Sequence, residues 1–302
     1  MHMSKKAILF PAFVREYSGL ENTFVYNSLP SFRRSLKLAS EITGTDLTLF
    51  DFDTNNFLND ELRSQYISYI FSCELADSIK HKIINFDYTA GYSMGIYAMF
   101  YYTGSISRED GLRIIKKAYE TVLETIPPNT FGMGNIIGLN LADIKTIIQD
   151  MEVEIINVNG SYNFFISGKL YSLLDILEKA KNEGAIHARL LPVGCPYHSK
   201  FISNASYSFG NFIQTLNINT PMIPAISCIN QREITDSSGI RTELINNLIT
   251  PLNWQDTILK MCKNGVDLFY ECGAGQSLVK LNKFIHGGHN TLKFNHLDKL
   301  SD

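Results

Sequence analysis

The pattern that decides the fold lies in the stretch Ile84-Asn85-Phe86-Asp87-Tyr88-Thr89-Ala90-Gly91-Tyr92-Ser93-Met94-Gly95. Residues 84–89 alternate apolar and polar side chains, which indicates a strand, and residues 94–102 contain no proline and can continue as a helix. A Gly-x-Ser-x-Gly turn between a strand and a helix is the context of a nucleophile elbow, in which Ser93 would stand on a sharp turn. The two glycines permit that turn, and the helix N-terminus offers N–H groups to an oxyanion. On this motif alone, a plain Gly/Ser turn is an equally good interpretation.

The composition excludes several classes of function. At 302 residues with 45% hydrophobic content, the chain can bury one large core or two smaller ones. A net charge of −3 provides no basic field for nucleic acid, and no apolar run approaches the roughly 20 residues that span a bilayer. The five cysteines form no C-x-x-C pair, so neither a zinc site nor a disulfide framework is indicated. We therefore expect a reduced, cytoplasmic protein without a signal peptide, a metal, or contacts to nucleic acid or membrane.

The segments on both sides of Ser93 predict an α/β body with a mainly parallel sheet. A short apolar strand at residues 6–10 ends at Pro11, and a helix at residues 108–126 is stopped by Pro127 and Pro128. Further helices are expected at residues 32–42, 61–81, 253–264 and 277–285, and further strands at residues 223–228 and 267–271.

The middle of the chain has a different pattern. Strands are predicted at residues 131–139, 153–158, 162–166 and 187–191, with helices at residues 141–150 and 170–181 and an Asn-Gly turn at Asn159-Gly160. This β-α-β-β-α-β order is typical of a ferredoxin-like unit. We expect an α/β fold in which residues 1–129 and 197–302 form a hydrolase-like large subdomain and residues 130–196 form an inserted ferredoxin-like small subdomain.

A serine nucleophile needs a base to accept its proton, and His198 is the candidate with the most informative context. It follows Pro192-Val193-Gly194-Cys195-Pro196-Tyr197 at the return from the predicted insert. The other histidines lie in polar regions or at expected element ends: His2, His81, His187, His286, His289 and His296. Without further information, His198 is more often an ordinary loop histidine than a base.

Several motifs in the same order resemble the malonyl-CoA:acyl-carrier-protein transacylases and the acyltransferase domains of polyketide synthases. The elbow of that family reads G-H-S-x-G, and its P-V-x-x-P-F-H-S segment is matched by residues 192–199. Between them, an A-N-x-N-S-P-x-Q-x-V-I-S-G segment is matched in part, and a C-terminal stretch is matched from Trp254 to Leu278. The similarity runs from about residue 6 to about residue 285. It identifies His198 as the base.

The resemblance implies a Ser–His dyad of Ser93 and His198, in which a backbone carbonyl orients the imidazole. The position before the tryptophan would supply that carbonyl, and Asn253 occupies it here. The oxyanion hole would consist of the backbone N–H groups of Met94 and Phe13.

The resemblance also implies the location of the acyl pocket. Gln65 matches a glutamine that lines this pocket in the family, and we expect Tyr92, Ala118 and Tyr197 to line it as well. No cofactor would be bound, because the acyl group arrives as a coenzyme A or phosphopantetheine thioester.

Three departures from the family pattern bear on the substrate. The N-terminal F-P-G-Q-G-S-Q becomes Phe10-Pro11-Ala12-Phe13-Val14-Arg15-Glu16, and Tyr92 replaces the histidine of the elbow. The arginine that binds the malonyl carboxylate, 25 positions after the serine, is Ala118 here. A hydrogen bond to a charged group contributes about 1.5–3 kcal/mol. Lys117 lies about 100° around the helix from position 118 and should not replace the arginine. We therefore expect the acyl group not to be malonyl.

Three functions remain open. The first is an acyltransferase in polyketide or fatty-acid biosynthesis that moves a non-malonyl acyl group between thioesters through an acyl-Ser93 intermediate, with acyl carrier protein as its partner. The second is a hydrolase that uses the same dyad to remove acyl groups from carrier proteins. The third is a catalytically idle module that binds carrier proteins. We expect a monomer in each case.

Overall fold

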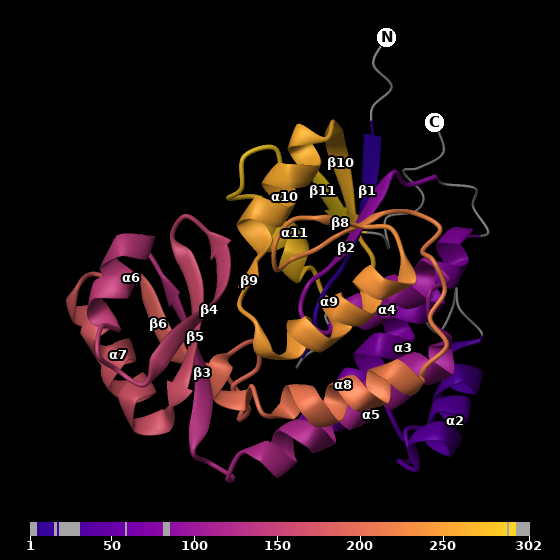
Figure 1. Ribbon diagram of the computed structural model, residues 1–302, viewed down its shortest axis with the longest axis horizontal. Helices are drawn as coiled ribbons and strands as arrows, with labels where there is room; N and C mark the ends of the chain where they lie inside the picture. The colour runs from indigo at the N-terminus through magenta and orange to yellow at the C-terminus, as the bar shows by residue number, and fades with distance from the viewer. Residues whose placement is uncertain are drawn as a thin grey trace.

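The computed structural model describes residues 5–14, 17, 31–57, 59–80, 85–288 and 290–293. Within these ranges the chain forms two sheets, which lie side by side in Figure 1. The larger sheet has the strand order β11-β10-β1-β2-β7-β8. Its strands are β1 (Lys5–Phe10), β2 (Tyr88–Gly91), β7 (Ala225–Ile226), β8 (Glu233–Ile234), β10 (Val266–Glu271) and β11 (Thr291–Lys293).

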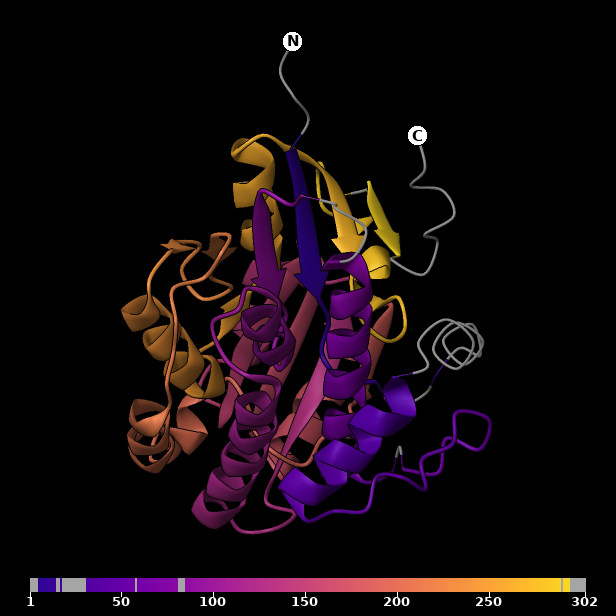
Figure 2. The same ribbon diagram turned by 90° about the vertical axis from the view of Figure 1, so that its right-hand side faces the viewer.

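The predicted parallel sheet is confirmed. β1 pairs in parallel with β2 and β10, and among the described strands of this larger sheet only the short edge pair β7–β8 is antiparallel. The sequence of β1 is apolar throughout its C-terminal half, as expected for a central strand covered on both faces. In Figure 2, helices lie in front of β1 and β2 and cover one face of the sheet.

Four helices build the main core of this body. They are α2 (Phe32–Thr43), α3 (Glu61–Lys80), α4 (Gly95–Tyr102) and α5 (Arg108–Thr125). α3 is buried over most of its circumference because it packs between α2, α4 and α5. The side chain of Ser107 accepts a hydrogen bond from the Asp110 N–H and so begins α5, while Pro127 follows its end. The body also contains α8 (Ala205–Thr215), α9 (Ser237–Ile249), α10 (Trp254–Lys263), α11 (Ser277–Asn282) and the 3-10 turn η1 (Lys200–Ile202).

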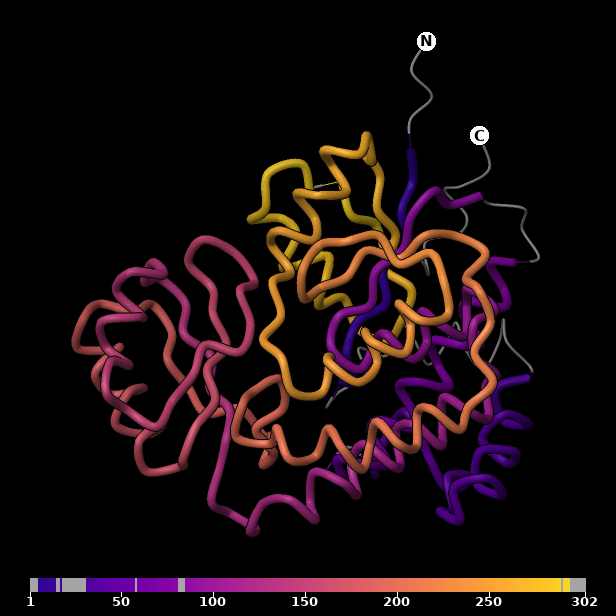
Figure 3. The backbone as a smooth tube through the Cα atoms, viewed as in Figure 1, coloured from indigo at the N-terminus to yellow at the C-terminus, as the bar shows by residue number. Residues whose placement is uncertain are grey.

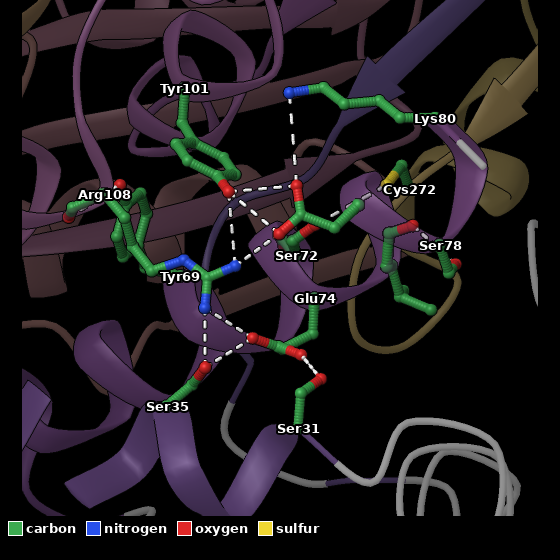
Figure 4. A network of polar contacts seen from close by, with 12 residues as sticks. Ser31, Ser35, Tyr69, Ser72, Glu74, Ser78, Lys80, Tyr101, Arg108 and Cys272 are labelled. Atoms are coloured by element: carbon green, nitrogen blue, oxygen red, sulfur yellow. Dashed lines mark hydrogen bonds and ion pairs between the residues drawn. The ribbon is translucent and has the colours of Figure 1, made fainter. Parts of the chain in front are cut away.

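A buried polar network fastens these helices together (Figure 4). The Arg108 guanidinium at the start of α5 binds Glu74 and Asp77, both from α3, and donates to Ser35 of α2. Tyr101 of α4 donates to both Asp77 oxygens, at 2.9 and 2.8 Å. One guanidinium therefore pairs with two carboxylates at a joint between four helices.

The predicted ferredoxin-like unit is confirmed by the second sheet, whose order is β6-β3-β5-β4-β9. Its parts follow the predicted β-α-β-β-α-β sequence: β3 (Phe131–Ile137), α6 (Leu141–Ile147), β4 (Val153–Gly160), β5 (Asn163–Lys169), α7 (Leu170–Asn182) and β6 (His187–Leu190). The expected Asn159-Gly160 turn is wrong, because β4 continues through Gly160 and the turn falls on the next two residues. The tube in Figure 3 shows the chain leaving the large body after α5 and returning to it.

The small sheet also receives a strand from outside the predicted insert. β9 (Leu252–Asn253) pairs in parallel with β4 at its edge. This pairing joins the small sheet to the large body. Strand β4 also contacts the segment before Ser93, because two of its asparagine side chains form hydrogen bonds with Tyr92.

Candidate active site

The elbow around Ser93 has the sharp turn predicted from its glycines. β2 ends at Gly91, α4 begins at Gly95, and Ser93 adopts a positive φ of 55°. A Cβ at Gly91 would come within 2.5 Å of the Ile96 backbone, and one at Gly95 would come within 2.2 Å of the Phe10 carbonyl oxygen. No side chain fits at such distances. The backbone of β1 can therefore approach the elbow only because position 95 is glycine.

Ser93 and His198 meet across the fold although 105 positions separate them. The distance from Ser93 Oγ to His198 Nε2 is 2.7 Å, which is a normal hydrogen bond. His198 is only 5% exposed, and burial lowers its pKa from 6.5 to about 4. The imidazole is therefore neutral at pH 7, and its Nε2 can accept the serine proton.

The end of α9 holds His198 in position. The His198 backbone N–H donates to the Leu248 carbonyl at 2.8 Å, and Nδ1 lies 2.5 Å from the Asn247 carbonyl oxygen. Because a carbonyl can only accept, Nδ1 carries the proton and Nε2 is left as the base. The last carbonyls of a helix have no partner within the helix, and His198 occupies two of them.

The prediction that the Asn253 carbonyl orients the imidazole is wrong. That carbonyl accepts from Thr257 Oγ1 at 2.8 Å and from Gln231 Nε2 at 3.4 Å, and the Asn253 side chain begins α10 by accepting from the Asp256 N–H. Asn247 takes the predicted role instead. Helix α9 was not predicted from the sequence, although Asp236 ahead of it is a normal N-cap residue.

Two cavities meet at the dyad. The larger has a volume of about 190 Å³ and the smaller about 30 Å³. Ser93 and His198 line both of them, as do Phe13 and Tyr197. Met94, the other predicted oxyanion donor, lines the smaller cavity as the N-cap residue of α4. Met94 and Phe13 both line a cavity together with Ser93. Their role as the donors of an oxyanion hole stays a prediction.

The residues predicted for the acyl pocket are divided between the cavities. Gln65 and Ala118 line the smaller one, Tyr92 lines the larger one, and Tyr197 lines both. Among the described residues, no lysine or arginine lines either cavity.

Glu61, which was not predicted as a site residue, is hydrogen-bonded to two residues that line the smaller cavity. Glu61 Oε1 accepts from the Tyr197 hydroxyl at 3.0 Å and from Gln65 Nε2 at 3.3 Å. Glu61 is four residues before Gln65 on α3, a spacing that places two side chains on one helix face. The polar groups of Gln65 and Tyr197 therefore face an anionic partner.

Tyr92, which replaces the histidine of the family's elbow, has a structural role here. Its hydroxyl donates to Asn159 Oδ1 at 2.8 Å and accepts from Asn157 Nδ2 at 2.7 Å, and its ring packs edge-on against Trp254. Both asparagines lie on β4. The residue before the nucleophile thus ties the elbow to the small sheet.

Two of the other histidines, His187 and His286, are exposed. His2, His81, His289 and His296 lie outside the described residues. Across these described ranges, no group of three or more His, Cys, Asp or Glu side chains could hold a metal ion. None of the helices described is long and apolar enough to cross a membrane.

Comparisons with known proteins agree with the fold and the site, although no family model matches the chain. The malonyl CoA-acyl carrier protein transacylase of Bacillus subtilis is 27% identical over 291 residues, which cover 94% of this chain and 91% of that protein. The enzyme of the same name from Staphylococcus aureus is 25% identical, with 94% and 93% covered.

Solved structures extend the agreement to the whole fold. The malonyl CoA-acyl carrier protein transacylase of Coxiella burnetii superposes with a TM-score of 0.88 at 25% identity, covering 97% of this chain and 94% of that one. A malonyl-transacylase solved in complex with a type II PKS acyl-carrier protein has the same fold, with a TM-score of 0.86 at 22% identity and 96% and 95% covered. Over nearly its whole length, the chain is therefore similar in sequence and fold to the malonyl CoA-acyl carrier protein transacylases.

Proposed function

We propose that this protein takes an acyl group from a thioester onto Ser93 and passes it to a second acceptor, with acyl carrier protein as its partner. The observation that carries the proposal is the contact of 2.7 Å between Ser93 Oγ and His198 Nε2. The relatives named as acyl carrier protein transacylases support the choice of partner. We expect the enzyme to act as a cytoplasmic monomer in polyketide or fatty-acid biosynthesis.

The geometry supports a two-step transfer. His198 Nε2 removes the Ser93 proton as Oγ attacks the thioester carbonyl, and the Asn247 carbonyl stabilises the imidazolium through Nδ1–H. The oxyanion would be held by the N–H groups of Met94 and Phe13. His198 then returns the proton to the leaving sulfur, and an acyl-Ser93 ester remains. A second acceptor reverses these steps.

The cavity walls favour an uncharged acyl group. Ala118 offers no cation, and the Glu61 carboxylate holds the polar groups of Gln65 and Tyr197 at the smaller cavity. A malonyl carboxylate there would lose its water without gaining a charged partner, a cost of at least about 1.5–3 kcal/mol.

Intact-mass measurement of the acyl-enzyme tests this proposal. The purified protein is mixed with malonyl, acetyl, butyryl and hexanoyl thioesters, and the mass gain is followed with time. We expect the uncharged groups to load faster than malonyl, and Ser93→Ala to abolish loading altogether. Faster loading of malonyl would contradict the argument from the pocket. Thioester turnover by Ser93→Ala that equals the wild type would contradict the dyad, and a complete lack of turnover by the wild type would favour the idle binding module.

Hydrolysis is the second candidate, and the smaller cavity favours it. This cavity touches both Ser93 and His198, and its volume of about 30 Å³ suits water better than a carrier thiol. Acyl-Ser93 that decays within minutes in buffer would support hydrolysis. Acyl-Ser93 that persists until holo carrier protein is added would support transfer.

A further inference from the structure

We propose that the smaller cavity selects a short acyl group that carries a hydroxyl, such as hydroxyacetyl, and that Asn247 Oδ1 accepts a hydrogen bond from that hydroxyl. This inference rests on the proposed acyl-Ser93 chemistry and deepens it, because it names the class of acyl group. Three observations carry it: the volume of the cavity, the lack of Asp, Glu, Lys and Arg among the described residues that line it, and a buried oxygen without a partner.

The volume of the smaller cavity limits the length of the acyl group. The cavity lies beside Ala118 and measures about 30 Å³, whereas one water-sized group needs about 10–15 Å³ of such volume. With the acyl carbonyl carbon bonded to Ser93 Oγ, the cavity has room for roughly two further non-hydrogen atoms. A hydroxyacetyl group meets this limit with its methylene carbon and its hydroxyl oxygen.

The other polar side chains at this cavity already have partners within the protein. Gln65 Nε2 and the Tyr197 hydroxyl both donate to Glu61 Oε1. Among the described residues that line the cavity, Asn247 alone has a buried side-chain oxygen or nitrogen without a hydrogen-bond partner. The polar group left to bind a ligand here is therefore an acceptor, and it calls for a donor on the acyl group.

The contacts of Asn247 determine which end of its amide is unpaired. The residue is 3% exposed, and its Nδ2 donates to the Ser93 carbonyl oxygen at 3.4 Å. Because a carbonyl oxygen can only accept, the nitrogen of the amide faces Ser93, and Oδ1 is left without a partner. A buried acceptor without a partner is unfavourable, so a donor on the acyl group would satisfy it. The amide also lies next to the residue that carries the acyl group.

A hydroxyl is the donor that fits this acceptor. An ammonium group would lose its water without gaining an anion, because no Asp or Glu is found among the described lining residues. A methyl group of the same size would leave Oδ1 unpaired and displace any water bound to it. Sites that hydrogen-bond a substrate hydroxyl strongly reject the analogue that lacks it. The hydroxyl stays intact during acylation: the carbon–sulfur bond breaks, the bond to Ser93 Oγ forms, and the serine proton passes through His198 to the thiol.

Two thioesters of equal size test the assignment. Hydroxyacetyl and propionyl coenzyme A differ only by a hydroxyl in place of a methyl group, and the initial mass gain on the protein measures each acylation rate. Each rate is divided by the rate of hydrolysis of the same thioester in buffer, because the hydroxyl also makes the carbonyl more reactive. We expect the corrected rate to be at least tenfold higher for hydroxyacetyl. Equal corrected rates would overturn the inference, and so would a higher corrected rate for glycyl coenzyme A.

A substitution of Asn247 tests the acceptor itself. Asn247→Leu removes Oδ1 and keeps a side chain of similar size, so the ratio of hydroxyacetyl to propionyl rates should fall at least tenfold. Loss of the contact to Ser93 slows both acylations and cancels in this ratio. Asn246→Leu, the same change one position earlier on α9, is the matched control and should leave the ratio as it is, because Asn246 lines neither cavity. An unchanged ratio in Asn247→Leu would show that Asn247 does not select the acyl group.

A second variant tests where the acyl group lies and leaves Asn247 in place. Ala118→Val adds two methyl groups at the smaller cavity, so it should slow acylation by hydroxyacetyl at least threefold more than acylation by acetyl, which is shorter. An equal loss for both would place the acyl group elsewhere and overturn the inference. The wild type and this variant decide the question even if thermal unfolding shows that Asn247→Leu does not fold. Failure of the proposed function has a different signature, since the wild type would then form no acyl-enzyme with any thioester.

Discussion

The burial of His198 makes the free energy of unfolding depend on pH, and a single substitution of this residue can measure that dependence. Burial lowers the pKa of His198 from 6.5 to about 4. Between these two pH values the unfolded chain binds a proton at this residue and the folded protein does not. The free energy of unfolding therefore rises with pH across this window and is lost as the pH falls from 6.5 to 4. At about 1.4 kcal/mol per pKa unit, the loss is about 3 kcal/mol.

His198→Asn is the matched variant. The backbone φ at His198 is 61°, a conformation that asparagine tolerates well. The Nδ2 of the new asparagine can donate to the Asn247 carbonyl, as the Nδ1–H of His198 does. Only the titrating group is lost. Other acid-sensitive residues titrate alike in both proteins, among them Glu243, whose pKa burial raises to about 7.

Urea unfolding of both proteins at several pH values from 7 to 4 measures the effect. We expect the wild type to lose about 3 kcal/mol more than the variant between these limits. A stability difference that stays constant across the range would refute the reasoning, because it would mean that His198 titrates at its ordinary pKa. The rate of Ser93 acylation offers a second readout, since a neutral base should keep it near its maximum down to about pH 5.

Three further substitutions have definite expected outcomes. Gly95→Ala should abolish acylation of the nucleophile and destabilise the fold, because its Cβ would lie 2.2 Å from the Phe10 carbonyl oxygen; thermal unfolding and acyl-enzyme mass report the two effects. Arg108→Leu leaves the buried Glu74 carboxylate without its cation and should cost about 3–5 kcal/mol in urea unfolding, whereas a loss below about 1 kcal/mol would show that the network is not needed. Tyr92→Phe removes the hydroxyl that two asparagines share and should cost about 1–3 kcal/mol, and an unchanged midpoint in the same assay would argue against this tie between the two bodies.

Features that depend on neighbouring residues could be predicted from the sequence. The alternating strand, the two glycines and the apolar helix predict the turn at Ser93, because the conformation of a turn depends on residues a few positions apart. The order of elements at residues 131–190 likewise predicts the small sheet, because ferredoxin-like pairing follows from chain order. Helix α9 was missed because its pattern has little amphipathic character, as its buried residues include the polar Glu243 and Asn247.

The sequence by itself determined the chemical groups of this protein: a serine on a sharp turn, a histidine that can act as its base, and an alanine where the family resemblance implies an arginine. Only the tertiary structure decided what surrounds them. It placed the Asn247 carbonyl, and not that of Asn253, against His198, and it left a cavity of about 30 Å³ beside Ala118. The physical reason is that a backbone turn is set by residues a few positions apart, whereas carbonyl partners and cavity volumes depend on how helices distant in the chain pack together.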